Sequence, residues 1–365
     1  MRNHDRARSA GPTALRRLIF FIALATILSG ALAAAIVWQR LQAPFKGYDT
    51  PEQFVEIPPG RSTQEIGLRL VQAGVVRDVW TFRAAVWRSG AGRRLKAGEY
   101  RFDRGLTAPD VIQKLARGDV YRRLLTFPEG LTIKEMAANF ESRGLGPGAS
   151  FEAAARDPAP IAALDPAVRD LEGYLFPETY SVPRHMPAAE LVRLMIERFE
   201  HEFPESLRQE ARAQGRSVHD VVTLAALVEK ETARAEERPL VAAVYLNRLN
   251  IGMGLQCDPT VIYALAKAGR YSGNLTRDSL AFDSPYNTYK YAGLPPGPIA
   301  APGRASLEAA VRPARVDYLY FVSRNDGSHV FAQTLDEHNR NVREYQVRYF
   351  RDKRFNPKSA IQNLQ

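Results

Sequence analysis

The stretch from residue 217 to 233, SVHDVVTLAALVEKETA, indicates how the largest part of this chain folds. Ser217 and Asp220 have the spacing of a capping box, in which a hydroxyl and an acid three residues later satisfy the free N–H groups of a helix start. The apolar run that follows can continue as a single helix. On that helix Glu231 lies seven residues after Leu224, which places it on the strongest apolar stripe.

Glu231 is therefore the acid of the Glu-Lys-Glu run that faces hydrophobic neighbours. Loss of hydration there disfavours the charged form and raises the pKa of a carboxyl, as a general acid at neutral pH requires. Glu229 follows alanines instead and lies off this stripe. The structural alternative is a half-buried Glu231 that pairs with Arg234 or Arg238.

Other segments combine acids, amides and aromatic rings. Residues 256–260, QCDPT, predict a helix start with Asp258 as the N-cap and Pro259 at the first helical position. Residues 284–289, SPYNTY, and 171–180, LEGYLFPETY, place aromatic groups beside amides and acids. Aromatic faces suit the C–H faces of sugars and amides suit hydroxyls. Each segment taken alone is also typical of a core or a turn.

Length and composition exclude several classes of protein. The chain has 365 residues, 45% hydrophobic and 25% charged, which is globular and long enough for two or three domains. A single cysteine excludes a disulfide framework and cysteine-rich metal sites. The sequence has no Gly-x-Ser-x-Gly, Gly-Lys-Ser/Thr or His-x-x-x-His motif. We therefore expect neither a metal nor a cofactor.

The net charge of +10 is concentrated at the two ends of the chain. Residues 1–17 hold five arginines and one aspartate, and residues 343–365 hold six basic and two acidic residues, so each end carries +4. The rest of the chain carries only +2. A nearly neutral body is a poor electrostatic match for nucleic acid, and we expect no nucleic-acid partner.

Residues 18–38 form an uncharged run of 21 residues, long enough to cross a bilayer as a helix. Arg16 and Arg17 precede it, which predicts a cytoplasmic N-terminus and a body on the periplasmic side of the inner membrane. ATP and NAD(P)H are not available there, which disfavours kinases and dehydrogenases. The alternative is a signal peptide cleaved after residues 31–33, ALA. The apolar run continues to Val37, which favours a retained anchor.

A short motif recurs along the next part of the chain. Residues 60–66, GRSTQEI, match residues 130–136, GLTIKEM, and more weakly residues 105–111, GLTAPDV. Each copy follows a strand-like run and predicts a turn and a capped helix start. These strand–helix units resemble LysM-type glycan-binding modules, although capping boxes are also common at ordinary helix starts.

The fold class predicted from these patterns is α+β, with one N-terminal transmembrane helix, a small LysM-like domain and a mixed α/β catalytic domain. A hairpin is expected between residues 318–322 and 329–332, joined by Asp326-Gly327. The predicted division is a cytoplasmic tail at 1–17, the anchor at 18–38, a linker at 39–52, the LysM-like domain at 53–143, a connection at 144–170, the catalytic domain at 171–349 and a basic tail at 350–365.

The ordered motifs together resemble the YceG/MltG family of membrane-anchored endolytic murein transglycosylases. The sequence departs from the pattern of this family at Cys257, where a small polar residue is expected. We expect this difference to have no consequence for the reaction. The segments that carry the resemblance are VEKETA at 228–233, ER at 237–238, YLNRL at 245–249, IGM at 251–253, LQ at 255–256, DPTVIY at 258–263, YNTY at 286–289, GLPPG at 293–297 and YLYFV at 318–322.

The resemblance implies that Glu231 is the catalytic residue. Such enzymes cut the β-1,4 bond between N-acetylmuramic acid and N-acetylglucosamine of nascent strands, and the muramyl C6 hydroxyl closes a 1,6-anhydro ring. The implied partners are glycan strands, the cytoplasmic membrane, penicillin-binding proteins and glycan polymerases. Composition and position in the family indicate as substrate-binding candidates Glu172, Tyr174, Glu178, Glu229, Gln256, Asp258, Asn287 and Tyr289.

Two other functions remain open from the sequence. The first is a muramidase that uses Glu231 as the acid and Asp258 or Glu229 as a second carboxylate, since ordinary glycosidases need two. The second is a glycan-binding scaffold of the cell-wall synthesis machinery without catalytic activity.

Overall fold

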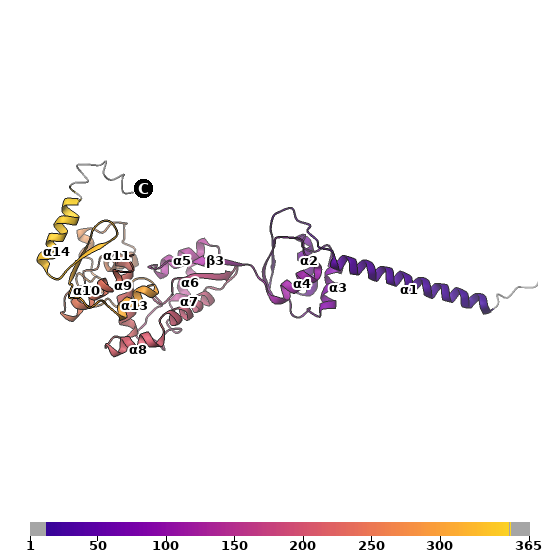
Figure 1. Ribbon diagram of the computed structural model, residues 1–365, viewed down its shortest axis with the longest axis horizontal. Coiled ribbons are helices and arrows are strands. Elements are labelled where there is room, and N and C mark those ends of the chain that lie inside the picture. Colours follow the sequence, from indigo (N-terminus) through magenta and orange to yellow (C-terminus); the bar gives the residue numbers. More distant parts are fainter. Residues whose placement is uncertain (1–11, 350, 352–365) are drawn as a thin grey trace, which may run out of the picture. The chain divides into compact units, whose positions relative to one another are not determined.

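The computed structural model describes residues 12–349 and residue 351 of the chain, and Figure 1 shows their helices and strands. The chain separates into two compact units, which we call unit 1 (up to Arg123) and unit 2 (from Leu124). Helices predominate in both, and the strands form three two-stranded sheets within the described residues. The predicted α+β class is confirmed.

Unit 1 begins with the long apolar helix α1 (Pro12–Gln42), which contains the predicted span. Its part from Ile19 to Gln42 is long and apolar enough to cross a membrane, and the residues from Ile19 to Arg40 are all exposed. Near the end of the helix, Leu41 is 4% exposed and belongs to the hydrophobic core of unit 1. The last turn of α1 is therefore fixed to the folded unit.

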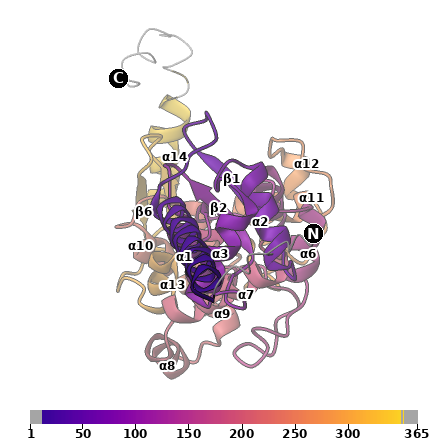
Figure 2. The ribbon, with the colours of Figure 1, turned by 90° about the vertical axis from the view of Figure 1, so that its right-hand side faces the viewer.

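The rest of unit 1 is a small sheet with three helices. Strands β1 (Gln53–Ile57) and β2 (Gly98–Phe102) pair antiparallel, with Val55 opposite Tyr100. The helices are α2 (Thr63–Gln72), α3 (Val79–Ser89) and α4 (Ala108–Arg117), and Figure 2 shows α3 beside α1. The starts of α2 and α4 form as predicted, with Ser62 and Thr107 as the N-caps.

Unit 2 is largely helical and shares one main hydrophobic core. Strand β3 (Arg122–Thr126) leads into it and pairs with β4 (Thr179–Pro183), and β5 (Tyr320–Ser323) pairs antiparallel with β6 (His329–Ala332). Its helices are α5 (Ile133–Ser142), α6 (Gly148–Ala155), α7 (Ala188–Glu202), α8 (Glu205–Ala213), α9 (Val218–Glu231), α10 (Arg238–Asn250), α11 (Asp258–Lys267), α12 (Arg277–Leu280), α13 (Arg304–Val311) and α14 (Leu335–Val342), followed by a π-helical turn at Arg343–Arg348.

The division between the units falls earlier than the sequence indicates. Residues 124–143 were assigned to the LysM-like domain, yet Phe127, Met136 and Phe140 belong to the core of unit 2. The second copy of the short motif, at 130–136, therefore lies in a different unit from the copy at 60–66. The motif reports a local strand-to-helix start, which occurs in both units, rather than membership of one domain.

Helix α9 forms as its sequence predicts. Ser217 and Asp220 make the capping box, and the helix ends at Glu231. Its middle is fully buried and packs against α8, α10, α11 and α13. The hairpin of β5 and β6 is also confirmed, with Gly327 in the left-handed region at φ 83°. The tail at 350–365 lies outside the described residues, apart from residue 351.

Candidate active site

Glu231 is the last residue of α9, and the neighbouring helix α10 reaches its carboxyl group. The hydroxyl of Tyr245 donates a hydrogen bond of 2.7 Å to Glu231 Oε1. Tyr245 is 1% exposed, and burial keeps its pKa well above the usual value, so its hydroxyl stays a donor. Glu231 as a whole residue is partly exposed at the end of α9.

The surroundings of Glu231 favour its protonated form. Burial of the carboxyl raises its pKa, and the nearby charge of Asp258 raises it further. Hydrogen bonds from Tyr245 and Cys257, together with His329, act in the opposite direction but do not cancel the effect of burial. A carboxyl whose protonated form is favoured in this way can donate a proton and take it back.

The loop before α11 brings further candidates to this carboxyl. The N-cap of α11 is Cys257, without a side-chain capping bond, and Asp258 is the first helical residue. The predicted capping role of Asp258 is therefore wrong by one position. Its carboxylate instead accepts a hydrogen bond of 2.6 Å from the hydroxyl of Tyr289. Sequence reasoning assigned Cys257 no chemical role, yet its thiol contacts both Glu231 and Tyr245.

The preceding residue, Gln256, has an unusual backbone for a residue with a side chain. Its φ of 51° lies in the left-handed region, and its N–H donates to the carbonyl of Thr288 at 3.2 Å. The Cys257 N–H donates to Thr288 Oγ1 at 3.0 Å. These bonds hold residues 256–258 against the loop that carries Tyr289. The structure thus gathers four predicted site residues, Glu231, Gln256, Asp258 and Tyr289.

Glu229 is used differently from Glu231. Its Oε1 forms an ion pair of 3.0 Å with Arg238, and its Oε2 accepts the N–H of Gly303 at 2.9 Å. Arg238 also pairs with Glu129 at 3.3 Å. Arg234 binds the carbonyl of Gly327 at 3.0 Å. Neither arginine pairs with Glu231, so the structural alternative for this carboxyl is wrong.

The other predicted site residues lie within the protein framework. Tyr174 is fully buried and bonds to Asp165, and Glu178 pairs with Arg198 at 2.7 Å. Asn287 is also fully buried, and its amide donates to the carbonyls of Leu280 and Phe282 at 2.9 and 2.7 Å. Because Tyr174 and Asn287 are fully buried, they support the segments to which they bond, and no surface of either is left for a sugar.

Glu172 is one of several other buried carboxyls and is distinct from the site at Glu231. It accepts the Ile133 N–H at 3.0 Å and the Tyr263 hydroxyl at 3.2 Å. Burial raises its pKa from about 4.5 to about 8. The side chain is therefore mostly neutral at pH 7.

This shift predicts how stability depends on pH. In the unfolded chain Glu172 is ionised above about pH 4.5, whereas in the folded chain it stays protonated until about pH 8. The free energy of unfolding therefore falls as pH rises between these two values. Glu172→Gln removes that part of the slope and stabilises the protein at pH 8 by at most about 5 kcal/mol. Urea titrations from pH 5 to pH 8 measure this. If the free energy of unfolding of Glu172→Gln depended on pH as steeply as that of the wild type, the raised pKa of Glu172 would be contradicted.

Three further residues contribute to the site without having been predicted from the sequence as site residues: Tyr245, Cys257 and Arg248. The buried guanidinium of Arg248 donates to the carbonyls of Leu319 and Leu255 at 2.6 and 2.7 Å, and so ties β5 to the loop before α11. The spacing of residues in the motifs does not predict these contacts. The only indication in the sequence that Tyr245 and Arg248 belong to the site is their position in the run YLNRL.

Tyr245→Phe tests the hydrogen bond to Glu231. The bond stabilises the carboxylate, so its loss raises the pKa of Glu231 further. If Glu231 acts as the acid, activity is lost as pH rises through this pKa, and the alkaline limb of the profile moves to higher pH in the variant. Tyr263→Phe is the matched control, because it removes a buried tyrosine–glutamate bond at Glu172. Equal shifts in both variants would contradict the assignment.

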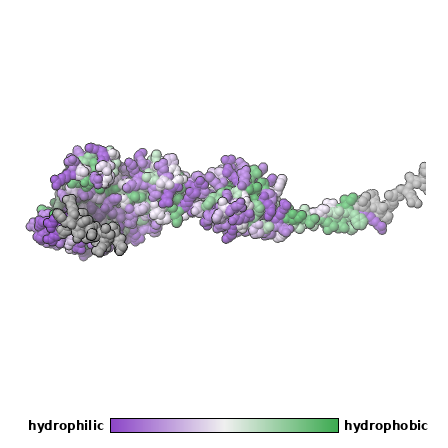
Figure 3. All heavy atoms as spheres, turned by 90° about the horizontal axis from the view of Figure 1, so that it is seen from above, coloured by the Kyte–Doolittle hydropathy of each residue, from purple (hydrophilic) through white to green (hydrophobic). Residues whose placement is uncertain are grey.

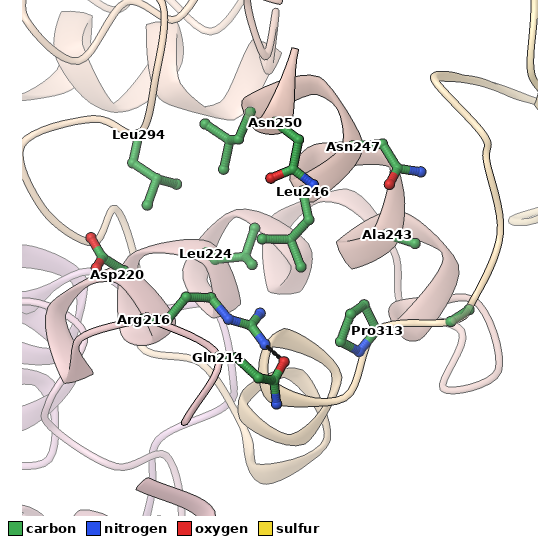
Figure 4. Close-up of a pocket in the computed structure, with 13 residues that line it drawn as sticks. Gln214, Arg216, Asp220, Leu224, Ala243, Leu246, Asn247, Asn250, Leu294 and Pro313 are labelled. Carbon is green, nitrogen blue, oxygen red and sulfur yellow. Dashed lines mark hydrogen bonds between the residues drawn. The ribbon is translucent and has the colours of Figure 1, made fainter. Parts of the chain in front are cut away.

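A cavity of about 500 Å³ lies beside the first half of α9 (Figure 4). Asp220 and Leu224 of α9, Leu246 and Asn250 of α10, and Arg216 are among the residues that line it. Glu231 does not line this cavity. Seven residues of helix separate Leu224 from Glu231, a rise of about 10 Å. The cavity is therefore separate from the candidate active site.

The chain is similar to proteins of known name. A family model described as the YceG-like family matches residues 55–344. The endolytic murein transglycosylase of Bacillus subtilis is 35% identical over 309 residues, which cover 80% of this chain and 84% of that protein. The endolytic murein transglycosylase of Streptococcus pneumoniae strain D39 is 31% identical, and the match covers 80% of this chain and 58% of that protein. The chain thus spans somewhat more than half of the streptococcal relative.

A solved structure agrees with this assignment. The crystal structure of a YceG-like protein from Listeria monocytogenes is 32% identical, with a TM-score of 0.55, and the match covers 80% of this chain and 98% of that one. Helix α9, Tyr245 and the loop before α11 all lie inside the residues that the family model matches. The chain belongs to the YceG-like family.

Proposed function

We propose that this protein is a peptidoglycan lytic transglycosylase that cuts the β-1,4 bond between N-acetylmuramic acid and N-acetylglucosamine and leaves a 1,6-anhydro end. The observation that carries the proposal is the carboxyl of Glu231, whose pKa is raised by burial, in a chain whose curated relatives are named endolytic murein transglycosylases. By cutting nascent strands internally, the enzyme would terminate their elongation.

One carboxyl is sufficient for this reaction. Glu231 in its acid form protonates the oxygen that leaves the anomeric carbon, and its carboxylate then accepts the proton of the muramyl C6 hydroxyl as that oxygen forms the new bond. The nucleophile is part of the substrate, so much of the entropy cost of bringing it to the anomeric carbon is already met. Tyr245 holds the carboxyl in place through both proton transfers.

The arrangement of the other acids favours this mechanism over the use of Glu229 as a second group. Both oxygens of Glu229 are engaged, one by Arg238 and one by the Gly303 N–H. Asp258 is exposed and close enough to act on the pKa of Glu231, so a muramidase that uses Asp258 is the second candidate. The two reactions differ in the product, because hydrolysis leaves a reducing end and transglycosylation does not.

We further propose that α1 anchors the protein in the inner membrane, with its N-terminus in the cytoplasm and with unit 2 and the part of unit 1 that follows α1 in the periplasm. The length and hydropathy of α1, and the arginines that precede its apolar stretch, support this. The strand–helix units of unit 1 would bind the glycan strand as LysM-like modules. Penicillin-binding proteins and glycan polymerases are the proposed partners, because the cut falls on strands under synthesis.

Digestion of purified glycan strands by the full chain in detergent tests the proposal. We expect new ends, with products of intermediate length appearing first, because internal cutting shortens strands before it releases small fragments. A protein that releases only terminal disaccharides would not be endolytic. Binding of strands without any new ends would identify a scaffold and contradict catalysis.

A further inference from the structure

Helix α3 presents two tryptophans to solvent. Trp80 and Trp87 are 75% and 87% exposed, whereas Phe82 and Val86 on the opposite face are buried in the core of unit 1. Trp80, Arg83 and Trp87 follow one another at spacings of three and four residues, so they lie on a single face of the helix. Two exposed tryptophans on one face mark an interaction surface.

Arginines surround these rings. Residues 77–94 contain five arginines and a single acid, Asp78, which caps α3. Arg83 lies over the ring of Trp80, with 5.3 Å between its guanidinium carbon and the ring centroid. The exposed face of α3 therefore combines amphipathic rings with positive charge, the composition of helices that lie in the headgroup region of an anionic membrane.

Contacts within unit 1 place this face beside the end of the membrane-spanning stretch. Arg88 of α3 lies 4.5 Å from the ring centroid of Trp38 of α1, and the charge of Arg40 acts on Asp78 at the start of α3. Twenty residues counted from Ile19 end at Trp38, which is the length that crosses a bilayer core of about 30 Å. Trp38, and with it Arg88, therefore lies at the level of the headgroups.

We propose that α3 is a second membrane contact, which docks with Trp80, Trp87 and its arginines on the outer leaflet of the membrane that α1 spans, next to anionic phospholipid headgroups. The proposal rests on the anchoring of the chain by α1. In Figure 3 hydrophobic surface continues from α1 onto the adjoining part of unit 1, as such a contact requires. Docking at two points would hold unit 1 at a fixed height above the bilayer.

The tryptophans themselves provide the test, because the chain has only three, Trp38, Trp80 and Trp87. The full chain is reconstituted in vesicles of phosphatidylethanolamine and phosphatidylglycerol that carry a spin label either near the headgroups or at the bilayer centre. In the variant Trp38→Phe, all tryptophan fluorescence comes from Trp80 and Trp87. We expect the shallow label to quench this emission several-fold more than the deep label, and aqueous acrylamide to quench it weakly, since such helices insert about 5–10 Å into the headgroup boundary.

The double variant Trp80→Phe with Trp87→Phe leaves Trp38 as the only emitter and separates the two proposals. Quenching of Trp38 by the shallow label places the end of the apolar stretch of α1 at the headgroups, as anchoring requires, whether or not α3 docks. If Trp38 is quenched by lipid while Trp80 and Trp87 are quenched only by acrylamide, the docking of α3 is refuted and the anchor stands. Protection of Trp80 and Trp87 from both quenchers would mean that protein covers them, which also refutes docking.

Charge reversal adds an electrostatic readout. Arg83→Glu lowers the binding constant for an anionic surface by about fivefold because one arginine is lost, and lowers it further because an acid is added. We expect the lipid quenching of Trp80 and Trp87 to decrease in this variant and with added salt. Arg69→Glu is the matched control, since it reverses one exposed arginine of the same unit that lies on α2 and not on α3. Equal effects of the two substitutions would contradict a specific role for α3.

Discussion

Glu231→Gln is expected to abolish strand cleavage, with a loss of at least about a thousandfold, because the amide can neither protonate the leaving oxygen nor accept the proton of the C6 hydroxyl. The amide has nearly the same shape and can still accept the hydrogen bond of Tyr245. Binding of glycan strands should therefore survive in the variant. The measurement is the rate of appearance of new chain ends under single-turnover conditions.

Glu236→Gln is the matched control for this experiment. Glu236 lies five residues further along the chain, and its side chain is 71% exposed and pairs only with Arg234 in the described part of the chain, at 3.5 Å. We expect Glu236→Gln to cleave glycan strands at the rate of the wild type. Residual cleavage by Glu231→Gln within tenfold of the wild type would rule out Glu231 as the general acid.

Arg248→Met is expected to have the second largest effect, on stability and on rate together. Arg248 is 7% exposed and donates to three backbone carbonyls, those of Leu319, Leu255 and Gly254. The substitution leaves these acceptors buried without donors, at a cost of about 3–4 kcal/mol in the free energy of unfolding. The loop that carries Cys257 also loses its support, and a small displacement near Glu231 lowers the rate by about 10- to 100-fold.

Arg248→Lys separates geometry from charge. The ammonium keeps the positive charge but cannot reproduce the planar fork that reaches β5 and the loop before α11 at once. We expect it to recover only part of the stability. Unfolding of unit 2 must be followed by circular dichroism, because all three tryptophans lie in unit 1. Full recovery by lysine would show that the charge alone matters.

The local features of the fold were predictable because short-range interactions specify them. The helix starts at Ser62, Thr132 and Ser217 depend on a hydroxyl and an acid three residues apart, and all three capping boxes form. The boundary between the units was not predictable in this way. It depends on the pairing of β3 with β4, more than fifty residues further along the chain, which no local motif encodes.

The candidate site shows the same division between local and long-range information. The position of Glu231 on the apolar stripe followed from the period of a single helix, and its raised pKa follows from that burial. Tyr245 was missed because its hydroxyl reaches Glu231 from another helix, and the sequence does not give the angle between α9 and α10. The role of Asp258 was misjudged by one residue, since both Cys257 and Asp258 precede Pro259 and either could have been the cap.

The most direct test of the mechanism is the mass of the newly formed ends when the wild-type chain digests glycan strands in water enriched in oxygen-18. If the muramyl C6 hydroxyl is the nucleophile, every new muramyl end is one water lighter than a reducing end and carries no heavy oxygen. New reducing ends labelled with oxygen-18 would instead show that water attacks the anomeric carbon, and the single-carboxyl account of Glu231 would be wrong.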